Sequence, residues 1–266
     1  MLSNYHSHTT MCDGKNTPEE MILAAIEKGF ESFGFSGHGY TDMDKSYCIL
    51  DTDEYLREIN RLKDLYKDKI DVYLGLEEDV YGPCDRHKYD YIIGSMHYFL
   101  INGEYYPVDM DYENLGNCVS LCDGNPLKLA ELYFENFCEY ILRRKPDIVG
   151  HFDLLTKFDE KYEPVFLGNP EYNKMAEIYL EKAISSGCIF EANTGAISRG
   201  YRVTPYPGEN LLYLMKKHNV PVVISSDCHS TDGIDCFFEE TKLILRDIGF
   251  KYRHVIKNGK FVPVNI

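Results

Sequence analysis

Short apolar segments alternate with amphipathic helical segments along almost the whole chain. Helical periodicity covers residues 16–29, 52–68, 125–145, 169–187, 210–219 and about 232–248. Seven segments have the length and apolar content of buried strands: the first ends at His6–His8, and the others cover 32–38, 70–79, 89–97, 146–153, 188–194 and 220–230. Repeated strand-then-helix units predict an α/β fold in which helices cover a parallel sheet.

Local signals support several of these elements. Thr17 is expected to cap the helix that begins at Pro18, with Glu20 completing a capping box and Gly29 ending the helix. The strands at 70–79 and 89–97 are joined by too little chain for a full helix. Asn258-Gly259 predicts a terminal hairpin over 252–264.

No linker or low-complexity segment interrupts the 266 residues, so we expect one domain over 1–266. Seven predicted strands within one uninterrupted domain favour a barrel over an open sheet. In a parallel α/β barrel, the C-terminal end of every strand opens on the same face, and the active site is built there.

Charge and composition exclude several classes of protein. The formal net charge of −15 argues against a nucleic-acid-binding surface, which needs a basic face. No apolar run approaches the roughly 18 residues of a membrane-spanning helix, and no export signal is apparent. The nine cysteines are odd in number and form no C-x-x-C pair, so we expect reduced thiols in a cytoplasmic protein. Cys118 and Cys122 have no further ligands that would make a zinc site.

Potential metal ligands gather at the ends of the predicted strands. Two imidazoles at i and i+2 on a strand, as in "HSH", share one face. Six of the nine histidines stand at or just after a strand end: His6, His8, His38, His97, His151 and His229. Carboxylates and an amide stand at the same places: Glu77, Glu78, Glu191, Asn193 and Asp227. Any single histidine, such as His97, is equally typical of a core or a loop, but together these residues predict convergence on one site.

Imidazole and carboxylate ligands without organised cysteines suit a cluster of Zn, Mn or Fe ions. The number of candidates exceeds what one tetrahedral ion can bind, so two or three divalent ions are expected, some of them bridged by a carboxylate. Closely spaced divalent ions lower the pKa of a bridging water and clamp phosphate oxygens. The sequence therefore indicates hydrolysis, most naturally of a phosphate ester.

The motifs resemble those of the PHP (polymerase and histidinol phosphatase) metal-dependent phosphoesterases, and among them the monofunctional histidinol-phosphate phosphatases. In chain order they are "HSHTTMCDG", "FSGH", "GLEED", "GSMH", "DIVGHFD", "FEANTGA" and "SSDCHS". The resemblance covers nearly the whole chain. It implies a distorted (βα)7 barrel, TIM-like in architecture, that hydrolyses L-histidinol phosphate to L-histidinol and phosphate in histidine biosynthesis, with a metal-bridging hydroxide as nucleophile.

The resemblance also implies a trinuclear metal site. His6, His8, Glu77 and Asp227 would hold one ion, Glu77, His97 and His151 a second, and Asp13, His38 and His229 a third. Glu77 is preferred to Glu78 because the glutamate of the family follows a Gly-x pair, here Gly75-Leu76. Consecutive strand residues face opposite ways, so Glu78 is expected to pair with a Lys or Arg on the helix side.

Substrate contacts are expected from cations that follow strand ends. Arg199, after the strand at 188–194, can pair with two phosphate oxygens at once, and Lys157 and Arg202 are further candidates. Asp227, or else His229, would relay a proton to the leaving alkoxide. Asp153 is a candidate partner for the substrate's imidazole or amine.

Three alternatives remain open at this stage. A PHP-type phosphoesterase acting on another small phosphomonoester or on a nucleotide would have the same metal ligands. A PHP domain serving as a structural or polymerase-associated module often loses ligands, whereas all nine positions are kept here. A metal-dependent amidohydrolase also begins with H-x-H, but usually places a bridging lysine on a middle strand. The sequence gives neither the physiological metal nor the oligomeric state.

Overall fold

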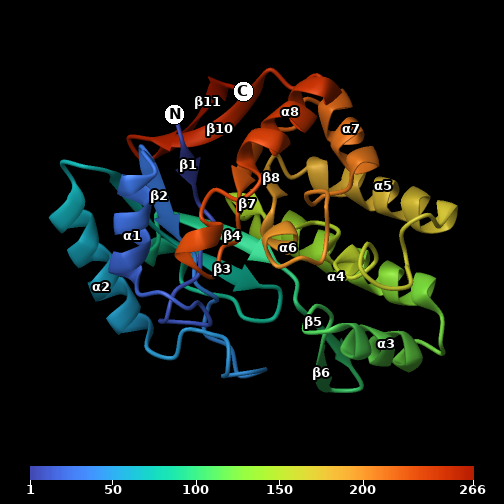
Figure 1. The fold of residues 1–266 in the computed structure, drawn as a ribbon. Helices are drawn as coiled ribbons and strands as arrows, with labels where there is room; N and C mark the ends of the chain where they lie inside the picture. The colour runs from blue at the N-terminus through green and yellow to red at the C-terminus, as the bar shows by residue number, and fades with distance from the viewer.

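A computed structural model describes residues 1–266, and its centre is a sheet of seven parallel strands in the order β1-β2-β3-β4-β7-β8-β9 (Figure 1). Their bounds are β1 Ser3–Asn4, β2 Ser32–Phe35, β3 Asp71–Asp79, β4 Tyr91–Ser95, β7 Ile148–Val149, β8 Ile189–Asn193 and β9 Val222–Ser225. Just beyond the outer strands, Ser7 forms a parallel bridge with Cys228, and the amide of His8 donates to the Cys228 carbonyl at 2.8 Å. The sheet therefore curls into a nearly closed barrel, as predicted.

The helices pack outside the barrel and lie close to their predicted ranges: α1 Pro18–Glu27, α2 Thr52–Tyr66, α4 Pro126–Arg144, α5 Pro170–Ile184, α7 Glu209–Lys217 and α8 Phe238–Ile248. The capping box of Thr17 and Glu20 is present at the start of α1. One prediction was wrong: α8 begins at Phe238 and not near residue 232. Thr231–Gly233 form a separate 3-10 turn (η3), and Phe237 has a left-handed backbone (φ 61°) that breaks the helix.

Several elements between the barrel strands were not predicted. β5 (Tyr98–Ile101) and β6 (Glu104–Pro107) form an antiparallel hairpin, followed by α3 (Tyr112–Leu121). Figure 1 shows this hairpin and α3 side by side at one edge of the molecule. Short turns also occur: η1 Arg86–Lys88 between β3 and β4, η2 Leu154–Thr156 after β7, and α6 Gly195–Ser198 after β8.

The barrel interior is filled at the N-terminal end of the strands. Tyr5, Tyr73, Tyr91, Ile93, Ile148 and Val223 pack there against Val255 and Ile256. The last two residues belong to β10 (Tyr252–Lys257), which pairs with β11 (Lys260–Asn265) around Asn258-Gly259 as predicted. The hairpin thus closes this end of the barrel, and polar side chains are left to the opposite end.

Alternation along β3 separates the two faces of the sheet. Val72, Leu74 and Leu76 belong to the core beneath the helices, whereas Tyr73 faces the barrel interior. Glu77 has the same parity as Tyr73 and therefore also points inward, while Glu78 points toward α4. All nine cysteines are unpaired thiols. None of the helices has the length and apolar character needed to cross a bilayer.

Candidate metal centre

Side chains from six of the seven barrel strands, or from the residues just after them, converge at the C-terminal end of the barrel. Glu77 lies within β3, and the other ligand candidates follow their strands by two to four residues, except Asp13, which lies in the loop after β1. Three groups of potential ligands form there: His6, His8 and Glu77; His38, Glu77 and His97; and His8, Asp13, His38 and His229. Within each group the ligand atoms lie within 4.8 Å of one another.

Glu77 stands at the centre of these groups, fully buried, with its two carboxylate oxygens facing different histidines. Its Oε2 lies 3.3 Å from Nε2 of His6 and 3.0 Å from Nδ1 of His38. Its Oε1 lies 3.2 Å from Nε2 of His151 and 3.5 Å from Nε2 of His97. A carboxylate placed in this way can bridge two metal ions.

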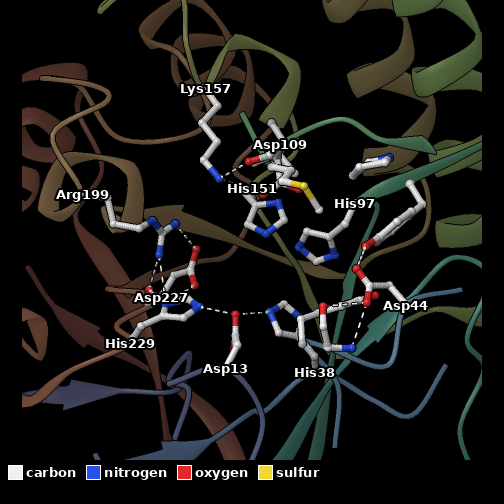
Figure 2. A pocket seen from close by; sticks show the side chains of 16 residues that line it. Asp13, His38, Asp44, His97, Asp109, His151, Lys157, Arg199, Asp227 and His229 are labelled. Atoms are coloured by element: carbon white, nitrogen blue, oxygen red, sulfur yellow. Dashed lines mark hydrogen bonds and ion pairs between the residues drawn. The ribbon is translucent and has the colours of Figure 1, made fainter. Parts of the chain in front are cut away.

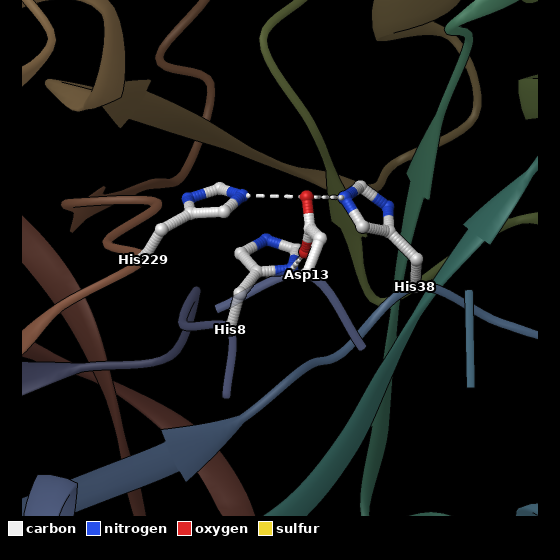
Figure 3. A group of neighbouring side chains, drawn as sticks. All are labelled: His8, Asp13, His38 and His229. Atoms are coloured by element: carbon white, nitrogen blue, oxygen red, sulfur yellow. Dashed lines mark hydrogen bonds and ion pairs between the residues drawn. The ribbon is translucent and has the colours of Figure 1, made fainter. Parts of the chain in front are cut away.

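Asp227 and Asp13 supply the other carboxylates of the centre. Oδ1 of Asp227 lies 3.2 Å from Nε2 of His8 and 3.7 Å from Nε2 of His6. Oδ2 of Asp13 lies 3.1 Å from Nε2 of His229 and 3.7 Å from Nε2 of His38, between the two rings in Figure 3. The ring of His8 stacks on that of His229 at 4.2 Å, so His8 lies between the Asp13 group and the Glu77 group.

The donor atoms fit a metal cluster. Nε2 of His6, Nε2 of His8 and Oε2 of Glu77 are buried and have no hydrogen-bond partner in the protein. Buried polar atoms of this kind are costly unless something satisfies them, and these three face one another. Burial lowers the pKa of His8 to about 3, assisted by His229 and His38, so its imidazole is neutral and able to coordinate.

The carboxylates of the centre are ionised. Burial by itself would raise the pKa of Glu77, but the charges of His6, His38 and His97 outweigh burial and hold that pKa well below its usual range. The pKa of Asp227 is also held well below its usual range, because Arg199 and His6 outweigh its burial. The centre therefore concentrates ionised carboxylates among imidazoles, a set of ligands that suits divalent cations.

Two further buried carboxylates orient His6, His97 and His151 from outside the group of potential ligands. Oε2 of Glu191 lies 2.9 Å from Nδ1 of His6, and its Oε1 accepts the His151 amide at 2.6 Å. Asp79, at the end of β3, accepts the His97 amide at 2.9 Å and lies 3.3 Å from Nδ1 of the same residue. The sequence placed Glu191 at a strand end without giving it a function, and Asp79 was not recognised. Its inward parity with Glu77 was the available signal.

Glu78 points away from the centre, as predicted. Its carboxylate accepts hydrogen bonds from Nε of Arg144 at 2.8 Å and from the Tyr140 hydroxyl at 2.7 Å, both on α4. The Cys84 amide donates a third bond at 2.7 Å. The predicted pairing with a helix-side cation is confirmed.

A cavity of about 310 Å³ opens directly over the centre (Figure 2). Eight of the residues proposed from the sequence line it: Asp13, His38, His97, His151, Lys157, Arg199, Asp227 and His229. Arg199 donates from Nη2 to Oδ2 of Asp227 at 3.0 Å and from Nη1 to the Asp227 carbonyl at 2.9 Å. Lys157 donates to Asp109, at 2.9 Å from the carboxylate and 2.6 Å from the carbonyl.

Two residues proposed for substrate binding do not line the cavity. The buried Arg202 guanidinium is held by Thr156, Thr204 and Glu160 and stacks on the Tyr206 ring at 4.4 Å. The Asp153 carboxylate accepts the Gly208 amide at 2.9 Å. Gly200, which has a left-handed backbone (φ 71°), lies between the two arginines, and only Arg199 lines the cavity.

The remaining lining residues come mainly from segments that sequence patterns did not interpret. The loop between β2 and α2 provides Asp44, Ser46 and Tyr47. The β5–β6 hairpin and the residues after it provide Tyr98, Pro107, Asp109 and Met110. Asn102-Gly103 marks the turn of that hairpin, with positive φ angles of 54° and 86°, and was the one available signal.

Comparison with known proteins places the chain in a family. The model of the PHP domain family matches residues 4–195. The chain is a member of the PHP domain family. Membership decides against the amidohydrolase alternative and agrees with the motifs that carried the resemblance.

Two relatives of this PHP protein are similar to it over most of their lengths. A protein of Schizosaccharomyces pombe named "Probable histidinol-phosphatase" is 28% identical, over 97% of this chain and 89% of the relative. The histidinol-phosphatase of Bacillus subtilis is 25% identical, over 88% of this chain and 96% of the relative. The histidinol phosphate phosphatase of Lactococcus lactis, solved with zinc, L-histidinol and phosphate, superposes with a TM-score of 0.71 at 18% identity, over 98% of both chains. That structural likeness shows that the two proteins have the same fold.

Proposed function

We propose that this PHP protein hydrolyses L-histidinol phosphate to L-histidinol and inorganic phosphate, as a phosphoric monoester hydrolase that uses two to three divalent metal ions. The observation that carries the proposal is the buried Glu77 carboxylate, whose two oxygens face His6 and His151 on different sides. The names of the relatives and the ligands bound by the Lactococcus lactis enzyme support the choice of substrate.

Three groups of residues would hold the ions. His6, His8, Glu77 and Asp227 form the first group, Glu77, His97 and His151 the second, and Asp13, His38 and His229 the third. Zn, Mn and Fe all suit this set of ligands. Divalent ions bound here would lower the pKa of a coordinated water and offset the negative charge on the phosphate oxygens.

Arg199 would bind and orient the phosphate. It lines the cavity beside Asp227 and presents a planar guanidinium with five N–H donors, of which the contacts to Asp227 use only a part. A guanidinium can donate two parallel hydrogen bonds to two phosphate oxygens. Lys157 lines the same cavity, but Asp109 already neutralises its charge, so its contribution to phosphate binding would be smaller.

Asp227 would move the proton. Its carboxylate lines the cavity, within 3.7 Å of Nε2 of both His6 and His8, so it could accept a proton from the attacking water and pass it to the leaving alkoxide oxygen. His229 is the second candidate, because it also lines the cavity and its Nδ1 lies 3.8 Å from Oδ1 of Asp227.

The decisive experiment combines metal analysis with substrate profiling. Purified protein is assayed for bound metal, and kcat/KM is measured for L-histidinol phosphate, a nucleoside monophosphate and a sugar phosphate. We expect bound divalent metal, a clear preference for L-histidinol phosphate, and loss of activity in a chelator that is reversed by added Zn, Mn or Fe. Equal or higher kcat/KM for another monoester or a nucleotide would replace the proposed substrate. Full activity without metal would overturn the mechanism.

A further inference from the structure

The cavity has two chemically different ends. Figure 2 shows Arg199, Asp227 and His229 on one side and Asp44 on the other, with His38 and His97 between them. The first end carries the guanidinium proposed to bind phosphate. The second is formed by Asp44 and two tyrosines, Tyr47 and Tyr98, which also line the cavity. A substrate with a phosphate at one end and a cationic ring-bearing group at the other would match this polarity.

Asp44 is a carboxylate without a cationic partner. Its Oδ1 accepts hydrogen bonds from the Ser46 amide at 2.8 Å and the Ser46 hydroxyl at 2.6 Å. Its Oδ2 accepts from the Tyr98 hydroxyl at 3.0 Å. The neighbouring Lys45 pairs with Asp42 instead, at 3.0 Å. These neutral donors fix the carboxylate, and the two bonds from Ser46 are the main reason that its pKa is lowered.

The other acid in this part of the cavity differs from Asp44. Asp109 pairs with Lys157 at 2.9 Å, so its charge is matched within the protein. Asp44 is therefore the lining carboxylate outside the metal centre whose charge no protein cation matches. A cation on a ligand would find its partner there.

The two tyrosines connect Asp44 to the metal centre. The Tyr47 ring stacks on the Tyr98 ring at 5.7 Å and 23°, and its edge-to-face contact with the ring of His38 is 4.7 Å. The two tyrosine rings therefore form an aromatic surface that starts in direct contact with His38, a proposed metal ligand. An organic group attached to a phosphate at the metal centre would lie against it, and flat rings pack well on such surfaces.

We propose that Asp44, Tyr47 and Tyr98 form a specificity wall in the cavity, an inference that rests on the proposed function. The Asp44 carboxylate binds the ammonium group of the substrate, and the tyrosine rings pack against its imidazole. Tyr98 is in addition a positioning residue, because its hydroxyl holds the carboxylate in place. The wall selects phosphomonoesters whose organic part carries a cation, and it disfavours nucleotides and sugar phosphates, whose organic parts offer no cation to Asp44.

Substrates with and without a cationic organic part test whether the specificity wall selects for a cation. We would measure kcat/KM for L-histidinol phosphate, for its analogue lacking the amine (an imidazolylpropyl phosphate), and for p-nitrophenyl phosphate, with wild-type protein and Asp44→Asn. The ratio of kcat/KM for L-histidinol phosphate to that for p-nitrophenyl phosphate should fall at least about tenfold in Asp44→Asn, which corresponds to about 1.4 kcal/mol. Tyr98→Phe should lower the same ratio, but by less.

Asp42→Asn is the matched control. It removes the same charge from the same loop, but Asp42 is an exposed residue that contacts Tyr40 and Lys45 and does not line the cavity. The ratio should stay at the wild-type value in this variant. Metal content is measured in every preparation, and loss of metal in Asp44→Asn would overturn the inference, because Asp44 would then act through the metal centre.

The outcomes separate the two proposals. Wild-type protein that shows no preference for L-histidinol phosphate would overturn the proposed function, whatever Asp44 does. Wild-type protein with the preference, together with an Asp44→Asn variant that retains it, would overturn only the wall. An equal loss on the analogue without the amine would overturn the assignment of Asp44 to the ammonium group.

Discussion

Glu191 accepts a hydrogen bond from Nδ1 of His6 at 2.9 Å, inside a fully buried environment. An ionised carboxylate can only accept, so Nδ1 of this imidazole carries a proton, and Nε2 is the nitrogen that faces Glu77 and Asp227. The same carboxylate accepts from the His151 amide at 2.6 Å and from the Ser225 hydroxyl at 2.5 Å. One side chain on β8 thereby fixes groups that follow β1 and β7 and the last residue of β9.

Glu191→Gln is expected to weaken metal binding. The amide cannot accept from His6 as strongly as the carboxylate, and loss of such outer partners typically lowers metal affinity about 10–100-fold. Competition with a chromogenic chelator measures the change. Glu181→Gln is the control, since Glu181 also lies beside a histidine, His218, at 3.7 Å, but on the surface. Unchanged affinity in Glu191→Gln would show that His6 is held in place by packing alone.

Glu77→Gln should impair metal binding and catalysis, whereas Glu78→Gln should impair stability, although the two residues are adjacent on β3. Glu77→Gln should lose at least one metal ion and reduce kcat by about 10²-fold or more, because one carboxylate would serve two ions. Glu78→Gln should keep its metal but unfold more easily, by about 3 kcal/mol, because Arg144 would lose its buried partner. Metal analysis and denaturant unfolding separate the two effects, and full metal content in Glu77→Gln would contradict the site assignment.

The stabilisation from Glu78 should depend on pH. Burial raises the pKa of Glu78, but Arg144 and the Cys84 amide outweigh burial, so the folded-state pKa is lowered. A group with a lowered pKa stabilises the fold above its unfolded value, about 4.3 for Glu, and loses that effect as the pH falls through the folded value. The difference in unfolding free energy between metal-free wild-type protein and metal-free Glu78→Gln should therefore be constant near neutrality and shrink below about pH 4. A difference that stays constant down to pH 3 would show that the ionised Glu78 carboxylate is not the source of this stabilisation.

Arg199 and Arg202 are three residues apart, and replacing each of them by Lys should have different effects. Arg199→Lys replaces a planar fork with a single ammonium, so we expect kcat/KM for L-histidinol phosphate to fall roughly 10²-fold with little change in stability. Arg202→Lys should change kcat/KM less than about threefold and lower the unfolding free energy by about 1–3 kcal/mol, because the buried Thr156 and the half-buried Thr204 lose a donor. A large kcat/KM effect from Arg202→Lys would restore it as a phosphate ligand.

The convergence of distant ligands could be predicted because it is a property of the fold. Once parallel strands close into a barrel, residues such as His6, Glu77 and Asp227 must meet at one end, whatever their separation in sequence. Alternation along β3 allowed only one of Glu77 and Glu78 to point inward, and the Gly-x pair that precedes the glutamate in the family motif selected Glu77. The orientation of each Glu77 oxygen could not be predicted, because it depends on the rotamers of histidines that follow four other strands.

The substrate side of the cavity could not be predicted from patterns. Asp44 and Tyr47 lie in a loop without periodicity, and their positions depend on contacts with Tyr98 of the β5–β6 hairpin. Asp153 follows β7 closely enough to be a plausible ligand, yet the turn of η2 directs its carboxylate to the Gly208 amide. Loop residues of this kind take their positions from tertiary contacts, which a single sequence does not display.

Tyr91 tests how the closed end of the barrel is packed. Its fully buried ring lies against Gly34 and Gly75, and its hydroxyl donates to the Tyr5 carbonyl at 2.6 Å and the Phe35 carbonyl at 3.2 Å. A Cβ on Gly75 would overlap the ring carbons of Tyr91, whereas a Cβ on Gly34 would overlap mainly its hydroxyl. Each alanine substitution should cost about 1–3 kcal/mol or more through overpacking. Gly116→Ala is the control, because it is exposed in α3 with no heavy atom within 4 Å of the added Cβ, and it should stabilise by about 1 kcal/mol.

Tyr91→Phe then distinguishes the two glycines. Removing the hydroxyl clears the space that Gly34→Ala needs, so the double variant Gly34→Ala/Tyr91→Phe should be more stable than the sum of the single effects, with a coupling of about 0.5–3 kcal/mol. Gly75→Ala/Tyr91→Phe should show almost no coupling, because the clash is with ring carbons that Phe retains. Denaturant unfolding of the metal-free proteins gives the unfolding free energy of every variant in these two double-mutant cycles. Equal coupling in the two cycles would mean that the ring shifts as a whole, and that the two glycines do not make room for separate parts of Tyr91.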